Sequence, residues 1–288
     1  MIEFAQVLVS GLGQGAIYAL MALGLAVVYR ATTVLNFMHG ENFMLGAVVA
    51  YLGIEAFGLP YLVAGAIALA VAFAVGLAID KLVYERLLKA PHLTQVFATI
   101  AVSFMLLGSA RLVIGDERPM PPLIPGPFLD LAGVRANPQD LVTASVLVVT
   151  ALVFFWMFER TELGLILKAS AQSPRGAALV GIDTRRIAAV MWGVGGALGA
   201  ISGILAAPFL QVSADMGSRP LILGFAAMTL GGFGSLPGAI VGGLLVGIAE
   251  VAGAYYVSTA LGDAAGFVVI ILVLIVRPAG LFGTNDVT

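Results

Sequence analysis

The sequence predicts an all-α fold, a polytopic bundle of membrane-spanning helices. Composition is the first observation: 60% of the 288 residues are hydrophobic and 10% are charged, against about 25% charged residues in a soluble domain. The second is the recurrence of apolar runs near the 20 or so residues that a spanning helix needs. We expect about eight transmembrane segments, with broken helices among them, in one transmembrane domain over residues 1–288.

The apolar runs can be followed in order. The expected spans are 7–29, 43–57, 60–79, 94–114, 141–158, 187–210, 239–257 and 264–276, with a broken or re-entrant piece at 221–230. The first residues carry no basic region and no small-residue cleavage site, so the first run is expected to be a retained helix. We expect a charged loop at 80–93 and a long irregular loop at 115–140, which holds six of the thirteen prolines.

The distribution of Lys and Arg predicts the orientation. With the segment 159–186 in the cytoplasm, ten of the fourteen basic residues fall on the cytoplasmic side and four outside, as the positive-inside rule requires. This places the N-terminus outside and the C-terminus inside. Trp156 and Trp192 flank the segment, where an interfacial aromatic belt is expected.

The segment 159–186 has the signals of a short, well-delimited helix. Ser173 is a helix N-cap and Pro174 suits the first helical position. Arg175, Gly176 and Ala177 continue the turn, and the helix is expected to run to residue 180. Gly181 favours a helix stop and Asp183 can cap the next helix. Such a helix on the cytoplasmic face is a docking surface for a partner.

Two interruptions divide the apolar pattern. The first is the polar stretch 32–42, and the second is 231–238, which contains Gly231, Gly232, Gly234 and Gly238. Paired broken helices in two halves of a chain are typical of internally repeated transporters. The two stretches share little sequence, so the residues leave open whether the halves form an inverted repeat.

Polar residues within or beside the apolar runs are candidates for a translocation path. Ionisable groups at membrane depth normally face a cavity or a partner. The candidates are Gln14, Tyr18, Asn36, His39, Glu41, Asn42 and Glu250. Asn36, His39 and Asn42 follow one another at intervals of three and could share a helix face. The alternative is structural: Glu41 favours the helix dipole, and its neighbours satisfy backbone groups at a helix start.

Small residues recur on the expected span 187–210. Gly195, Gly199 and Gly203 stand four residues apart and form a face that allows another helix to approach closely. Close packing is the expected role, and a hinge is the alternative.

Several classes of function are excluded or disfavoured. There are no cysteines and only two histidines, so we expect no metal site and no thiol chemistry. No phosphate-binding Gly-x-x-x-x-Gly-Lys-Ser/Thr motif occurs, and we expect no catalytic residues and no cofactor. The few basic residues disfavour nucleic-acid binding.

Four motifs together resemble a known family. They are Leu35-Asn36-Phe37-Met38-His39-Gly40-Glu41, Leu179-Val180-Gly181-Ile182-Asp183, Leu230-Gly231-Gly232-Phe233-Gly234-Ser235-Leu236-Pro237-Gly238-Ala239 and Ile248-Ala249-Glu250. They resemble the permeases of bacterial branched-chain amino-acid ABC importers, of the Liv H-type. The likeness extends over essentially the whole chain.

The resemblance implies an inner-membrane subunit in contact with lipid, paired with a homologous second permease. Two cytoplasmic ATPase subunits would bind ATP, and a periplasmic or extracellular binding protein would deliver substrate. It also implies that Ser173 to Gly181 is the coupling helix, which sits in an ATPase groove. Many importers carry Glu-Ala-Ala near this helix, whereas Gly176-Ala177-Ala178 lacks the Glu, so Arg175 is the candidate for the charged contact.

Two other functions remain open from the sequence. The first is a secondary transporter of small polar solutes, driven by an ion gradient, in which Glu41 and Glu250 would be proton or Na⁺ sites. The second is a membrane scaffold, against which the broken helices argue, since irregular backbone at depth is tolerated only in protein or beside a cavity.

Overall fold

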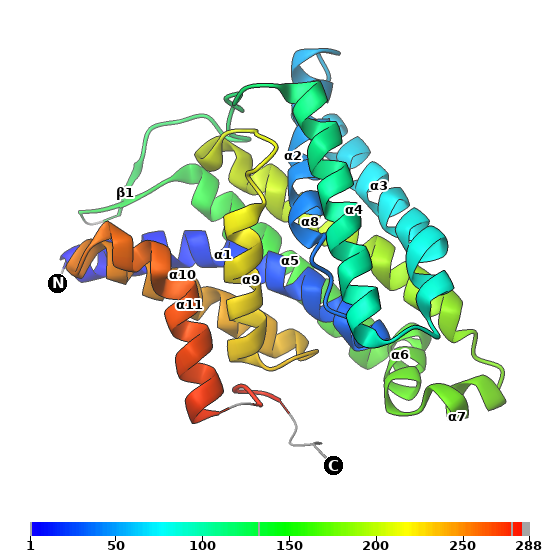
Figure 1. The fold of residues 1–288 in the computed structure, drawn as a ribbon. Helices are drawn as coiled ribbons and strands as arrows, with labels where there is room; N and C mark the ends of the chain where they lie inside the picture. The colour runs from blue at the N-terminus through cyan, green and yellow to red at the C-terminus, as the bar shows by residue number, and fades with distance from the viewer. Residues whose placement is uncertain (1, 132, 278, 284–288) are drawn as a thin grey trace.

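The computed structural model describes residues 2–131, 133–277 and 279–283. Within these ranges the side chains of eight residues lie outside the description: Leu131, Ala171, Gln172, Pro174, Arg175, Leu261, Asp263 and Ala265. The predicted all-α membrane bundle is confirmed (Figure 1). In the described residues the regular strands are one hairpin, β1 (Leu129–Leu131) and β2 (Val134–Ala136), within the predicted irregular loop.

Eleven α-helices are formed by the described residues. Six are long and apolar enough to span a membrane, counting α3 with the turns that extend it to Leu87. These six are α1 (Ile2–Thr32), α3 (Tyr61–Ile79), α4 (His92–Ile114), α5 (Pro138–Arg160), α8 (Thr184–Leu210) and α10 (Leu236–Tyr256). The shorter helices are α2 (His39–Glu55), α6 (Glu162–Gln172), α7 (Pro174–Leu179), α9 (Ser218–Gly231) and α11 (Thr259–Val276). The predicted number of about eight spans was therefore approximate, because two of the eight, 43–57 and 264–276, fall in α2 and α11, which are not among these six.

Two predicted connections contain more helix than expected. The charged loop predicted at 80–93 was wrong in its first half, since α3 continues through a π-helical turn at Asp80–Tyr84 and a 3₁₀ turn at Glu85–Leu87. In the segment 159–186, α6 precedes the short helix α7. Figure 1 shows α6 and α7 together at one end of the bundle, which we name the α7 end.

The two long helices α1 and α8 end in the same unusual way. Each is followed by a non-glycine residue with left-handed backbone, Thr33 (φ 58°) and Gln211 (φ 61°), and these are the two non-glycine residues of positive φ in the described chain. L-residues rarely adopt this conformation. A non-helical segment of six or seven residues follows in each case, 33–38 and 211–217, before the short helices α2 and α9 begin.

Packing between the halves repeats the same plan. A Cβ on Gly76 of α3 would fall on the Trp192 carbonyl of α8, and one on Gly247 of α10 would fall on the Gly15 backbone of α1. The short helices α2 and α9 cross where a Cβ on Gly217 would fall on the Gly40 carbonyl. The order α1–α4 is thus matched by α8–α11 about that crossing.

The two halves are inverted relative to each other. Along α1 and α8, Val28 lies against Gly195, and Leu20 clusters with Leu205. Residue numbers fall on one helix as they rise on the other, so the leading helices of the two halves are antiparallel. The structure therefore contains the inverted repeat that the sequence left open.

The second broken helix was assigned to the wrong stretch. The counterpart of 33–38 is 211–217, whereas Gly231, Gly232, Gly234 and Gly238 form the tight turn between α9 and α10. Gly232 (φ 102°) and Gly234 (φ 74°) adopt the conformation that favours glycine. The Gly231 and Gly238 backbones are in contact, so this stretch closes a helical hairpin.

The glycine face of α8 receives two other helices. A Cβ on Gly195 would meet Val28 of α1, one on Gly199 would lie 3.0 Å from the Cβ of Asn42, and one on Gly203 would fall on the Phe43 carbonyl. Backbone approach of this kind is how membrane helices associate without a hydrophobic driving force.

One aromatic prediction was wrong. Trp156 is 62% exposed on α5, as a lipid-facing anchor would be, but Trp192 is 1% exposed. Trp192 packs inside the bundle against Tyr84, with ring centroids 5.6 Å apart. Its position near a polar segment suggested the membrane surface, but its large apolar side chain fills the gap between α3 and α8.

The surroundings of two glycines predict different effects when each is replaced by alanine. Gly203→Ala should lower the free energy of unfolding by about 1–3 kcal/mol, because the added methyl group overpacks the α2–α8 contact. Gly65→Ala, on α3 with nothing within 4 Å of the added carbon, should leave stability unchanged or raise it. Thermal unfolding in detergent measures both. Equal effects of the two substitutions would contradict the packing described here.

Candidate translocation and coupling sites

The α7 end is built from three capped helix starts. The side-chain oxygens of Thr161, Ser173 and Asp183 accept hydrogen bonds from the backbone N–H groups of Gly164 (3.3 Å), Gly176 (3.1 Å) and Arg186 (3.2 Å). Each cap satisfies an N–H that a helix start leaves without a partner. These caps fix where α6, α7 and α8 begin.

The short helix α7 presents an apolar tip. Ala177 is buried, whereas Leu179 and Val180 are 89% and 76% exposed. Gly181 follows with φ 84° and ends the turn. Of the residues predicted to couple this segment to a partner, Pro174 and Arg175 have side chains outside the described part of the structure. The exposed pair Leu179 and Val180 was not singled out from the sequence, although both close the predicted helix.

Charged contacts tie this segment to the bundle. Lys168 of α6 pairs with Glu159 at the end of α5 (2.8 Å), and Arg185 of α8 pairs with Glu85 (3.5 Å). The guanidinium of Arg30, near the end of α1, lies 5.0 Å from the centroid of the Phe158 ring. Lys168 therefore links α6 directly to α5, and the Arg30–Phe158 contact links α5 to α1, so displacement of α6 would disturb α5 and, through it, α1.

The polar cluster at the first broken helix is buried inside the bundle. Asn36, His39 and Asn42 are 2%, 0% and 0% exposed. Asn36 precedes α2, so only His39 and Asn42 share a helix face, and both lie against Gly199. Asn36 Oδ1 accepts from the Met38 N–H (3.1 Å), which matches the structural alternative. No side-chain nitrogen or oxygen of His39 or Asn42 is in a hydrogen bond of good geometry.

Glu41 stands apart from this cluster. It lies in the first turn of α2, half-buried beside Ser103 of α4. A carboxylate in the first turn favours the helix dipole, and its Oε2 is not in a hydrogen bond. The Glu41 carboxylate therefore stabilises the start of α2 and also lies at the contact between α2 and α4.

A second polar network joins α1, α9 and α10. Gln14 donates to the Tyr18 hydroxyl (2.7 Å), and Tyr18 lies against Glu250. Arg219 in the first turn of α9 donates to Glu250 Oε1 at 2.6 Å. Glu250 is 7% exposed, while the Arg219 side chain is 53% exposed.

Arg219 was missed as a site residue from the sequence, where it counted only as an outside charge. The signal was available, because an acid within an apolar helix needs a partner and Arg219 opens the helix after the second break. The arrangement places a partly exposed cation and a buried carboxylate together at the start of a broken helix.

The network predicts a measurable coupling. In a double-mutant cycle with Arg219→Gln and Glu250→Gln, the interaction free energy should be about 1–2 kcal/mol, between the values for exposed and buried pairs. The matched control is Arg111–Asp215, a 2.9 Å pair with both side chains about 60% exposed, for which about 0–1 kcal/mol is expected. Thermal unfolding of the wild type and the six variants measures both cycles. A larger coupling in the control pair would contradict this account.

Comparison with known proteins covers nearly all of the chain. The family model described as "Branched-chain amino acid transport system / permease component" matches residues 7–276. The permease protein BraD of Pseudomonas aeruginosa is 33% identical over 302 residues, covering 99% of this chain and 97% of BraD. LivH of Escherichia coli K12 is 32% identical over 300 residues, with the same coverage. Both are named high-affinity branched-chain amino acid transport system permease proteins.

An archaeal relative extends the comparison. A probable LivH of Methanocaldococcus jannaschii is 30% identical over 290 residues, covering 92% of this chain and 88% of its own. The resemblance inferred from four motifs is therefore confirmed over the full length. The chain is a multi-pass membrane protein that belongs to the branched-chain amino acid transport system permease family.

Proposed function

We propose that this chain is a permease subunit of a bacterial ABC importer and forms half of a translocation path for branched-chain or related amino acids. The observation that carries the proposal is the match over residues 7–276 to a family named for this transport, with two relatives above 30% identity over nearly their whole length. Residues 1–288 act as one transmembrane domain, and residues 159–186 are its coupling segment.

The partners follow from what the chain has and lacks. It carries no phosphate-binding loop motif, so ATP is bound by two separate ATPase subunits in the cytoplasm. A homologous second permease supplies the other half of the path, and a periplasmic or extracellular binding protein delivers substrate. The apolar tip Leu179–Val180 of α7 is the contact for an ATPase groove, because two exposed apolar side chains on a capped turn bury well in such a groove.

The mechanism is alternating access between two packings of the bundle. ATP binding draws the ATPases together and moves α7, and the contacts of α6 and Arg30 pass this movement to α5, α8 and α1. A bundle with two discrete packings is enough for nucleotide on one face and loaded binding protein on the other to bias transport. Glu250 and Arg219 lie on the path, where their opposite charges suit the carboxylate and ammonium groups of an amino acid.

The proposed orientation puts the α7 end in the cytoplasm of a cell with the protein in its inner membrane. The chain contains no cysteine, so single cysteines report on accessibility without a background. Leu179→Cys should react with an impermeant maleimide only in inside-out vesicles. Phe57→Cys, 76% exposed between α2 and α3, should react in right-side-out spheroplasts. The reverse pattern would contradict the orientation.

The α7 tip makes a direct prediction about coupling. Leu179→Glu should lower ATP-driven uptake at least ten-fold, because burying a carboxylate in an apolar groove is strongly unfavourable. Leu179→Met keeps the apolar contact and should retain most of the uptake. Co-purification of the ATPase subunits with each variant separates loss of docking from loss of transport. Normal uptake and normal co-purification for Leu179→Glu would contradict the docking role.

A further inference from the structure

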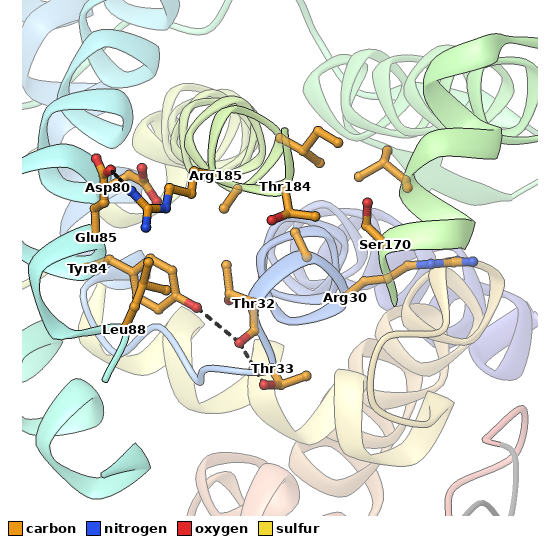
Figure 2. Close-up of a pocket in the computed structure, with 14 residues that line it drawn as sticks. Arg30, Thr32, Thr33, Asp80, Tyr84, Glu85, Leu88, Ser170, Thr184 and Arg185 are labelled. Carbon is orange, nitrogen blue, oxygen red and sulfur yellow. Dashed lines mark hydrogen bonds and ion pairs between the residues drawn. The ribbon is translucent and has the colours of Figure 1, made fainter. Parts of the chain in front are cut away.

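A cavity of about 290 Å³ lies at the α7 end, away from the polar networks on the proposed path. It is bounded by the end of α1, the π-helical turn after α3, the coupling-segment helix α6 and the start of α8. Figure 2 shows Asp80, Glu85 and Arg185 gathered on one wall and Ser170 on the opposite wall. The volume is near the lower limit for small-molecule sites, which suits a ligand of amino-acid size.

The cavity wall holds polar atoms that the protein itself leaves unsatisfied. Asp80 is 3% exposed, and its Oδ1 is not in a hydrogen bond. The Oγ of Ser170 on α6 is also buried and without a hydrogen bond. A buried carboxylate oxygen and a buried hydroxyl each cost free energy until they gain partners. Both residues line the cavity, so a bound molecule can supply what they lack.

The backbone at this wall is irregular. Asp80 begins the π-helical turn and Tyr84 ends it. Such turns are rare in proteins, and those that occur often lie at functional sites. The turn brings both side chains to the cavity, where Tyr84 donates to the Thr32 carbonyl (3.3 Å, Figure 2). The sequence predicted a charged loop here, whereas in the structure this π-helical turn forms one wall of the cavity.

The lining is matched to a small zwitterion with an apolar side chain. An unsatisfied carboxylate oxygen favours an ammonium group, and the hydroxyls of Thr184 and Ser170, together with Arg185, can donate hydrogen bonds to a carboxylate. Apolar side chains complete the lining: Leu88, Leu167 and Ile187. Arg30 also lines the cavity, but its guanidinium lies over the Phe158 ring. Its contribution to the wall is therefore the aliphatic part of the side chain.

We propose that this cavity binds a free aliphatic α-amino acid from the cytoplasmic side and that the bound amino acid holds the coupling segment against the bundle. The proposal rests on the proposed function, because it takes the ligand from the class of solute carried. The ligand touches α6, α8, α1 and the π-helical turn together, so its occupancy opposes movement of α6 and α7. By linkage, a ligand that favours one packing slows the cycle that needs the other.

The test uses the permease purified with its ATPase subunits, in phosphatidylcholine nanodiscs and without the binding protein. Radiolabelled leucine should bind saturably and lower the ATPase rate. Asp80→Asn should weaken binding at least ten-fold and relieve the inhibition, because it removes the charge and keeps the volume. Glu55→Gln, an exposed carboxylate at the end of α2, should do neither. N-acetyl-leucine, which lacks the ammonium group, should not compete.

Three further arms fix the interpretation. Ser170→Leu fills the cavity from α6, so it should also abolish leucine binding and decides the matter if Asp80→Asn fails to fold. Nanodiscs containing phosphatidylethanolamine test whether a lipid headgroup occupies the cavity. If this lipid displaces leucine from the wild type and the displacement depends on Asp80, the proposal is overturned in favour of lipid. ATP-driven uptake with the binding protein is measured in parallel. If the wild type takes up leucine but the nanodisc complex does not bind it, this inference is overturned and the proposed function stands. If the wild type shows no ATP-driven uptake, the result counts against the proposed function.

Discussion

The contact between Gly40 and Gly217 is the constraint on which the architecture depends. Non-helical backbone at membrane depth is tolerated only where protein or a water-filled cavity satisfies its polar groups. Both breaks meet this requirement locally: the N–H of Phe37 donates to Thr99 Oγ1 (3.3 Å), and Val212 exchanges two backbone hydrogen bonds with Arg118. Because neither glycine has a side chain, α2 and α9 can start against each other and the two halves share one centre.

This centre explains why charge and polarity are placed where they are. The first break is surrounded by buried Asn36, His39 and Asn42, and the second by Arg219 with Glu250. The long helices on either side, α1 with α10 and α3 with α8, are held together by close glycine contacts. These contacts leave the paired helices little freedom to move relative to each other. Change between two packings is therefore expected at the breaks, where the contacts are polar, and at the α7 end, where they are polar and partly exposed.

The sequence predicted much of this fold because its strongest signals are local. Apolar length identified the spans, and Ser173, Gly181 and Asp183 delimited the α7 region as the structure has it. The second break was misplaced because Gly231 to Gly238 is a stronger turn signal than 211–217, whose role depends on a partner helix far away in sequence. Trp192 and the π-helical turn at Asp80–Tyr84 were missed for the same reason, since packing between α3 and α8 decides both. The Arg219–Glu250 pair joins residues 31 positions apart, and only the α9–α10 hairpin brings them together.

Identifying the energy source that drives transport is the most direct test of the account. The chain would be reconstituted in proteoliposomes with its co-purified subunits and the cognate binding protein, and uptake of labelled leucine compared with ATP inside or with an imposed proton or Na⁺ gradient. The account predicts uptake that requires ATP and persists when ionophores collapse the gradients. Uptake driven by a gradient without ATP would contradict it, and would make Glu41 and Glu250 candidates for ion-coupling sites.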